Sequence, residues 1–174
     1  MTVGRVVPVL NIIKDRSTNM YRVLITDDEK IEREGIKFLL AQEEGEYEIH
    51  EAANGRQALN VLRSEEIDFL LTDIKMPHMD GLELASKVRE EYPNLPIVIF
   101  SGYSDFAFAQ EAMRYGVKDY VLKPVDPDTF HTTIGKVKAE LQSIRSKKQK
   151  EEKGKNFLLQ YFLQTYPVSY THLR

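Results

Sequence analysis

Several polar residues follow short apolar segments of the sequence, and their types suit the transfer of a phosphoryl group. Asp27 and Asp28 follow the first segment, Asp73 the third, Ser101 the fourth and Lys123 the fifth. If these segments are parallel strands of one sheet, the polar residues meet in a crevice at its carboxyl edge. The sequence therefore predicts a cleft that contains three carboxylates, one hydroxyl group and one ammonium group.

Such a cleft predicts a bound metal ion and a nucleophile. Three neighbouring carboxylates repel one another unless a cation neutralises them, and oxygen ligands suit Mg²⁺ better than zinc. Because Mg²⁺ uses only one or two protein carboxylates, a third is left to attack phosphorus, and Asp73 is the natural candidate. The equatorial phosphoryl oxygens would then contact Mg²⁺, Lys123 and the Ser101 hydroxyl with a neighbouring backbone N–H.

The segments that must position these residues alternate between two periodicities. Short apolar runs predict strands, and apolar residues at spacings of three or four predict one buried face on each intervening helix. This alternation predicts an α/β fold, a doubly wound parallel sheet with helices on both faces. The predicted strands are 23–25, 47–49, 69–71, 97–100 and 120–122. The predicted helix faces are Ile31, Phe38 and Leu39; Ala58, Val61 and Leu62; Leu82, Ala85 and Val88; Phe106, Ala109 and Met113.

The C-terminal part of the sequence predicts a long helix. An apolar stripe at alternating spacings of four and three packs on the sheet and then stops at Lys148. The stripe is Phe130, Ile134, Val137, Leu141 and Ile144.

The domain division follows from these patterns. We expect a single domain over residues 20–145 and a charged helical linker over 146–166, which leads toward an output domain absent from the chain. Residues 1–19 are interpreted as a disordered or non-native extension, and 167–174 as a non-native tail.

Composition excludes several classes of protein. The chain has 174 residues, a formal net charge of -3 and no cysteine, so disulfides, thiol nucleophiles and Cys-ligated zinc are excluded. The apolar stretch 6–13 is too short to span a bilayer and is a poor signal peptide, which predicts a cytoplasmic protein with no membrane contact. The basic run 147–150 is followed by acidic residues and is interpreted as a solvated helix face.

Four short motifs together resemble the response-regulator receiver domain, over about residues 21 to 145. They are Ile25-Thr26-Asp27-Asp28-Glu29, Leu71-Thr72-Asp73-Ile74-Lys75-Met76-Pro77, Phe100-Ser101-Gly102 and Tyr120-Val121-Leu122-Lys123-Pro124. The resemblance implies a flavodoxin-like five-stranded sheet of order 2-1-3-4-5. It also implies that Asp28, Asp73 and the Lys75 carbonyl bind Mg²⁺ directly, that Asp27 acts through water, and that the Lys123–Pro124 peptide bond is cis.

The same resemblance implies a partner and a switch. A sensor histidine kinase would donate the phosphoryl group to Asp73, and slow hydrolysis would remove it, so the chain is expected to modify itself and not to be a conventional enzyme. Ser101 and Tyr120 would then rearrange the face formed by the fourth helix, the fifth strand and the fifth helix, and phosphorylation would favour a homodimer. The stretch from Ser101 to Tyr120 is similar to regulators with an AraC-type DNA-binding domain, so DNA contact is expected only through an absent output domain.

Alternative interpretations remain at this point. An acidic pair alone is more often a solvated loop or a helix cap, and Tyr120 is also consistent with a half-buried core residue. A small-molecule phosphatase that forms an aspartyl-phosphate usually has a second Asp near the nucleophile, where this sequence has Lys75. A related interaction module that no longer accepts phosphate would lack one of the motif residues, all of which are present.

Overall fold

The computed structural model describes residues 20–102 and 106–166. The predictions for residues 1–19 and 167–174 lie outside this range. The elements follow in chain order: β1 (Met20–Thr26), α1 (Lys30–Leu40), β2 (Glu46–Ala52), α2 (Gly55–Ser64), β3 (Phe69–Asp73), α3 (Gly81–Glu91), β4 (Ile97–Ser101), α4 (Phe106–Arg114), β5 (Asp119–Leu122) and α5 (Pro127–Thr165). Each predicted strand is present and is extended by a residue or more.

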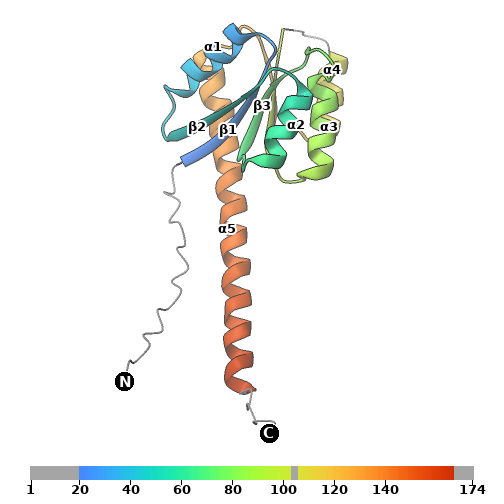
Figure 1. The fold of residues 1–174 in the computed structure, drawn as a ribbon. Coiled ribbons are helices and arrows are strands. Elements are labelled where there is room, and N and C mark those ends of the chain that lie inside the picture. Colours follow the sequence, from blue (N-terminus) through green and yellow to red (C-terminus); the bar gives the residue numbers. More distant parts are fainter. Residues whose placement is uncertain (1–19, 103–105, 167–174) are drawn as a thin grey trace, which may run out of the picture.

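The strands form one parallel five-stranded sheet in the order β2-β1-β3-β4-β5, as predicted (Figure 1). The registers Thr26↔Thr72 and Asp73↔Phe100 bring the carboxyl ends of β1, β3 and β4 to the same edge. The pairing of Ser101 with Leu122 adds the end of β5. The residues that follow these strands therefore lie at one end of the sheet.

Helices cover both faces of the sheet, which confirms the doubly wound, flavodoxin-like architecture. On one face α2, α3 and α4 pack through residues such as Leu59, Leu84 and Ala112. On the other face α1 and α5 pack through residues such as Leu40 and Ile134. Because the central strands β3 and β4 are covered on both sides, their apolar residues are all buried.

The predicted buried face of α1 is wrong. Ile31 and Phe38 are 74% and 70% exposed, whereas Ile36 and Leu40 are buried against the sheet. The apolar residues of this helix fall on two stripes, and helical spacing alone does not decide which stripe faces the core. Leu39 packs at the edge of the buried stripe.

The predicted face of α4 is also wrong. Phe106 and Met113 are 76% and 55% exposed, Ala109 is half-buried, and the residue of this helix that is fully buried is Ala112. A small side chain at the contact lets the helix approach the sheet closely, with Phe108 partly buried and with Phe106 and Met113 in solvent. The faces predicted for α2 and α3 are correct, with Val61 only partly buried.

Helix α5 is one continuous helix of 39 residues. It begins with Asp126 as N-cap, whose side chain accepts a hydrogen bond from the Thr129 N–H, and with Pro127 in its first turn. Its first turns pack on the sheet, and the rest extends away from the domain (Figure 1). Near its end several large apolar side chains, Phe157 and Phe162 among them, are exposed. Within the described residues no helix is both long and apolar enough to cross a membrane.

Candidate functional site

Three aspartates meet where β1 and β3 end. Asp27 and Asp28 come directly after β1, and Asp73 is the last residue of β3. One carboxylate oxygen of each lies within 4.8 Å of the other two. Asp27 is buried, Asp73 is half-buried and Asp28 is exposed. A cluster of oxygen donors that opens to solvent on one side fits Mg²⁺, which combines protein carboxylates with water ligands.

The ammonium group of Lys123 lies among carboxylates. Its Nζ is 2.9 Å from Asp27 Oδ2, 3.2 Å from Asp73 Oδ1 and 3.5 Å from Glu32 Oε2. Lys123 directly follows β5, and its peptide bond with Pro124 is cis, as the resemblance implies. The structure thus places the predicted cation beside the predicted nucleophile.

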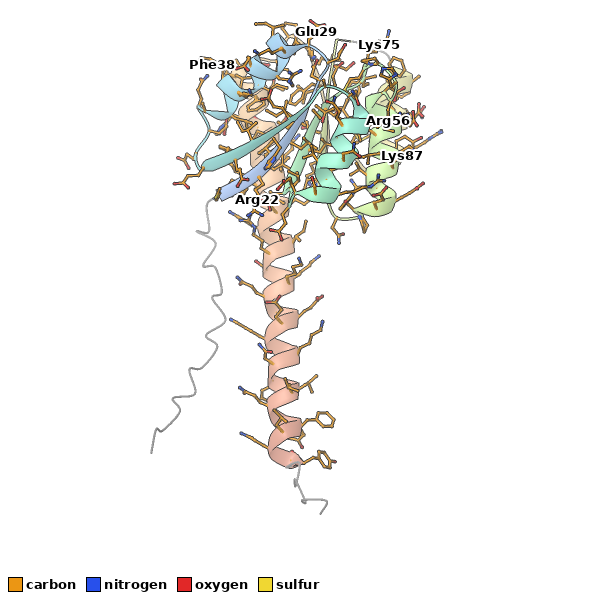
Figure 2. All side chains as sticks on the ribbon, in the orientation of Figure 1. Arg22, Glu29, Phe38, Arg56, Lys75 and Lys87 are labelled. Carbon is orange, nitrogen blue, oxygen red and sulfur yellow. The ribbon has the colours of Figure 1, made fainter. Side chains whose placement is uncertain are left out.

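Ser101 and Lys75 also lie at this edge of the sheet. Ser101, the last residue of β4, is fully buried, and its carbonyl oxygen accepts a hydrogen bond of 2.8 Å from the backbone N–H of Lys123. Lys75 lines a cleft of about 360 Å³ together with Asp28, Asp73 and Lys123. Figure 2 shows Lys75 and Glu29, another residue of this cleft, at the same end of the molecule.

Tyr120 lies within β5, on the side of the sheet that α2, α3 and α4 cover. It is partly buried and packs against the core on that side. Its backbone pairs with Ile99, two residues before Ser101. Tyr120 does not line the acidic cleft, so any role in the site would be indirect.

The electrostatics of the cleft are those of three carboxylates that share one ammonium group. Burial lowers the pKa of Lys123, but the hydrogen bond to Asp27 and the charges of Asp73, Asp27 and Glu32 outweigh it and raise the pKa to about 12. Burial raises the pKa of Asp73; the charge of Lys123 opposes this shift, and that of Asp27 adds to it. Lys123 therefore stays positively charged at neutral pH, and the surroundings of Asp73 make its charged form less favourable than in water.

The loop between β3 and α3 holds the Asp73 backbone in place. Gly81 N–H donates a 2.7 Å hydrogen bond to the carbonyl of Ile74, and Asp80 caps α3 by accepting from the Glu83 N–H. His78 has a φ of 70°, which places it in the left-handed region. A Cβ at position 81 would lie 2.0 Å from the carbonyl oxygen of Asp73, so only glycine fits there. Gly81 was not among the predicted site residues, although Asp-Gly before a helical segment is a recognisable turn signal.

The backbone of Asp27 has its own supports. Its N–H donates to the Ala52 carbonyl at 3.1 Å, and its carbonyl oxygen accepts a 2.7 Å hydrogen bond from Arg33 Nη1. Arg33 Nε is in turn held by Glu51 at 2.9 Å. Asp27 Oδ1 accepts from the Glu29 N–H, which ties the acidic pair to the start of α1. Glu51 is distant in sequence from the motif, and the contact of Arg33 with the Asp27 carbonyl depends on how α1 packs, so neither residue was predicted.

Glu32 is a further residue of the cleft that the sequence analysis missed. It lies in the first turn of α1, four residues after Asp28. Asp28 lies before α1, so helical spacing does not link it to Glu32, and the contact of Glu32 with Lys123 depends on how α1 packs. Glu32 brings an additional carboxylate to Lys123.

The response regulator receiver domain family matches this chain over residues 23–135. Among curated proteins, the uncharacterized transcriptional regulatory protein YesN of Bacillus subtilis is 38% identical over 132 residues, which cover 74% of this chain and 36% of that protein. Regulatory protein AtoC of Escherichia coli is 34% identical over 128 residues, or 74% of this chain and 27% of that protein. The chain thus spans between about a quarter and about a third of the length of these relatives.

Solved structures agree with this match. The REC domain of AraT, a response regulator from Geobacillus stearothermophilus, is 40% identical with a TM-score of 0.65, and the match covers 72% of this chain and 98% of that one. The response regulator protein TrrA from Thermotoga maritima, in complex with Mg(2+)-BeF, is 32% identical with a TM-score of 0.61. That match covers 68% of this chain and 99% of that one.

Proposed function

Because the chain belongs to the response regulator receiver domain family, we propose that Asp73 accepts a phosphoryl group from the phosphohistidine of a sensor histidine kinase. The observation that carries this proposal is the position of the Asp73 carboxylate. It is half-buried at the end of β3, 3.2 Å from the Lys123 ammonium and within reach of the other two aspartates. No other aspartate of the cleft is both accessible and paired with the lysine.

The roles of the residues follow from their surroundings. An Asp73 oxygen attacks phosphorus and forms a P–O bond while the bond to the donor histidine breaks. Lys123 balances the charge on one phosphoryl oxygen, and the Ser101 hydroxyl with a nearby backbone N–H binds another. Asp27 fixes the Lys123 ammonium, because it is buried and makes the shortest of its contacts.

The residues of the cleft fit Mg²⁺. Asp28, Asp73 and the backbone carbonyl of Lys75 would hold the ion, and Asp27 would contact it through water. When bound, Mg²⁺ supplies positive charge for the phosphoryl oxygens and relieves the repulsion among the carboxylates. The fit rests on the cluster of Asp27, Asp28 and Asp73, which has one exposed member, and on Lys123, whose single positive charge is smaller than the charge of the three carboxylates. The Mg(2+)-BeF complex of the related TrrA supports this assignment.

We propose that Ser101 and Tyr120 pass the signal to the face formed by α4, β5 and α5. Ser101 and Tyr120 lie on adjacent strands, and Tyr120 is only partly buried, so it has room to turn inward if Ser101 moves toward the phosphoryl group. The exposed side chains of Phe106, Met113 and Leu122 make the face apolar enough for a protein contact. Phosphorylation would favour a homodimer through it.

The remaining assignments concern the longer protein and the cell. We propose residues 20–145 as the receiver domain and 146–166 as a helical linker, which matches the extension of α5 beyond the sheet. Both relatives named above are regulatory proteins, and this chain covers 36% of one and 27% of the other, so we place any contact with DNA in an output domain outside the matched region. A cytoplasmic location and slow hydrolysis of the phosphoryl group belong to the same proposal.

The acceptor can be located chemically. The chain would be phosphorylated with acetyl phosphate and Mg²⁺ and then reduced with borohydride, which converts an aspartyl phosphate to homoserine. Mass spectrometry of the peptides should find homoserine at position 73. Homoserine at position 27 or 28, with position 73 unchanged, would contradict the proposal.

A further inference from the structure

Glu32 gives Lys123 a third carboxylate partner that the proposed function does not use. The other two are Asp27 at 2.9 Å and Asp73 at 3.2 Å, and Glu32 makes the longest contact at 3.5 Å. The side chains of Asp27 and Asp73 are 2% and 13% exposed, whereas that of Glu32 is 43% exposed. Of the three carboxylates, Glu32 thus makes the longest and most exposed contact with Lys123.

A phosphoryl group on Asp73 would need a share of the same ammonium. Lysine has three N–H donors, and three carboxylates already surround this one. Asp27 is buried, and without its contact to Lys123 its charge would be buried and unpaired, which is costly. Asp73 carries the phosphoryl group, so Glu32 is the carboxylate that would lose its contact with Lys123.

The surroundings of Glu32 allow it to leave. Besides the acidic cleft, Glu32 lines a neighbouring cavity of about 620 Å³, with Gly35 of α1 and with Lys123 and Pro124 after β5. The Glu32 side chain is 43% exposed, so it can turn away from Lys123 toward solvent by changing rotamers. If it stays, its charge lies near the phosphoryl oxygens and repels them, because all are held by one ammonium group.

We propose that Glu32 competes with the phosphoryl group for Lys123 and so limits the stability of the phosphorylated state. The inference rests on the proposed function of Asp73 and adds a control on it from α1. Glu32 is a positioning residue in this account, since it acts through Lys123.

The test is the affinity of the full chain for beryllofluoride at saturating Mg²⁺, measured by calorimetry. Glu32→Gln should bind beryllofluoride about two- to fivefold more tightly than wild type, the range of a partly exposed ion pair. The same variant should bind Mg²⁺ alone no more tightly than wild type, because it has lost a negative charge. A variant that only damaged the cleft would lose affinity for both.

Glu34→Gln is the matched control. Glu34 also lies on α1 and is 48% exposed, but it pairs with Lys37 at 2.9 Å instead of Lys123. The affinity of the Glu34→Gln variant for beryllofluoride should equal that of wild type. An equal gain in both variants, or no gain in Glu32→Gln, would overturn the inference. If wild type itself did not bind beryllofluoride with Mg²⁺, that result would contradict the proposed function of Asp73 and, with it, the inference about Glu32.

Discussion

The carbonyl oxygen of Asp73 occupies the space where a side chain at Gly81 would begin, since a Cβ there would lie 2.0 Å from it. Gly81→Ala should therefore push the loop between β3 and α3 away from the acceptor and lower the free energy of unfolding by about 2 kcal/mol or more. Urea unfolding measures this. Gly135→Ala is the control, because Gly135 lies in α5 with nothing within 4 Å. It should stabilise the chain by about 0.5 to 1 kcal/mol. If Gly81→Ala lowered the free energy of unfolding by no more than this amount, the account would be contradicted.

Asp73→Asn should stabilise the metal-free protein. Burial raises the pKa of Asp73, so the folded state binds this proton more tightly than the unfolded state does. The stability from this group is therefore present below its ordinary pKa of 3.8 and is lost as the pH rises through the folded pKa. At pH 7 in EDTA the variant should be more stable by on the order of 1 kcal/mol.

Mg²⁺ should reverse this order. The ion should stabilise wild type more than Asp73→Asn, because the variant lacks one of its ligands. Thermal unfolding with EDTA and with millimolar Mg²⁺ measures both effects. A variant that is less stable than wild type in EDTA, yet equally stabilised by the ion, would show that Asp73 is neither strained nor a ligand.

The sheet could be predicted from the sequence because its signals are local. Each apolar run, such as Ile97 to Phe100, carries its own strand signal, and the polar residues after the runs follow from the parallel topology. The burial of helix faces is not local. Ile31 and Phe38 have helical spacing but face solvent, because the competing stripe of Ile36 and Leu40 fits the sheet.

The acidic cleft shows the same limit. Its residues at strand ends were found because a single rule places them together. Glu32, Arg33 and Gly81 were missed because their contacts depend on how α1 and the loop after β3 approach the cleft, which no spacing in the sequence encodes. The Asp-Gly pair indicates a turn, but the reason why position 81 must be glycine is apparent only when the carbonyl of Asp73 is in place.

The stabilisation that the Glu51 carboxylate provides should be lost in acid. The hydrogen bond from Lys37 lowers the pKa of Glu51; partial burial opposes this shift, and the hydrogen bond from Arg33 adds to it. A lowered pKa means that this stabilisation is present above the ordinary value of 4.5 and is lost as the pH falls through the folded pKa. Glu51→Gln should cost less than about 1 kcal/mol at pH 7, given solvent screening, and progressively less as the pH falls through the folded pKa of Glu51. Urea unfolding at several pH values tests this, and a cost that grows toward low pH would refute it.

Arg33→Met should weaken Mg²⁺ binding severalfold. Removing a positive charge near the acidic pair would by itself strengthen binding of a cation. The loss of the 2.7 Å hydrogen bond to the Asp27 carbonyl should outweigh this by releasing the acidic pair. Calorimetry measures the affinity for Mg²⁺. Arg63→Met is the control for the loss of a positive charge elsewhere in the protein, because Arg63 pairs with Glu91 on the surface of α2 and α3. Tighter Mg²⁺ binding by Arg33→Met would show that charge and not position is what Arg33 contributes.

The central claim is that Asp73 accepts the phosphoryl group, and the intact mass of the chain after incubation with acetyl phosphate and Mg²⁺ tests it most directly. Wild type should gain the mass of one phosphoryl group, and the gain should disappear in EDTA and in Asp73→Asn. Circular dichroism would confirm that both proteins are folded. An adduct that persists in folded Asp73→Asn, or no adduct on folded wild type, would contradict the claim.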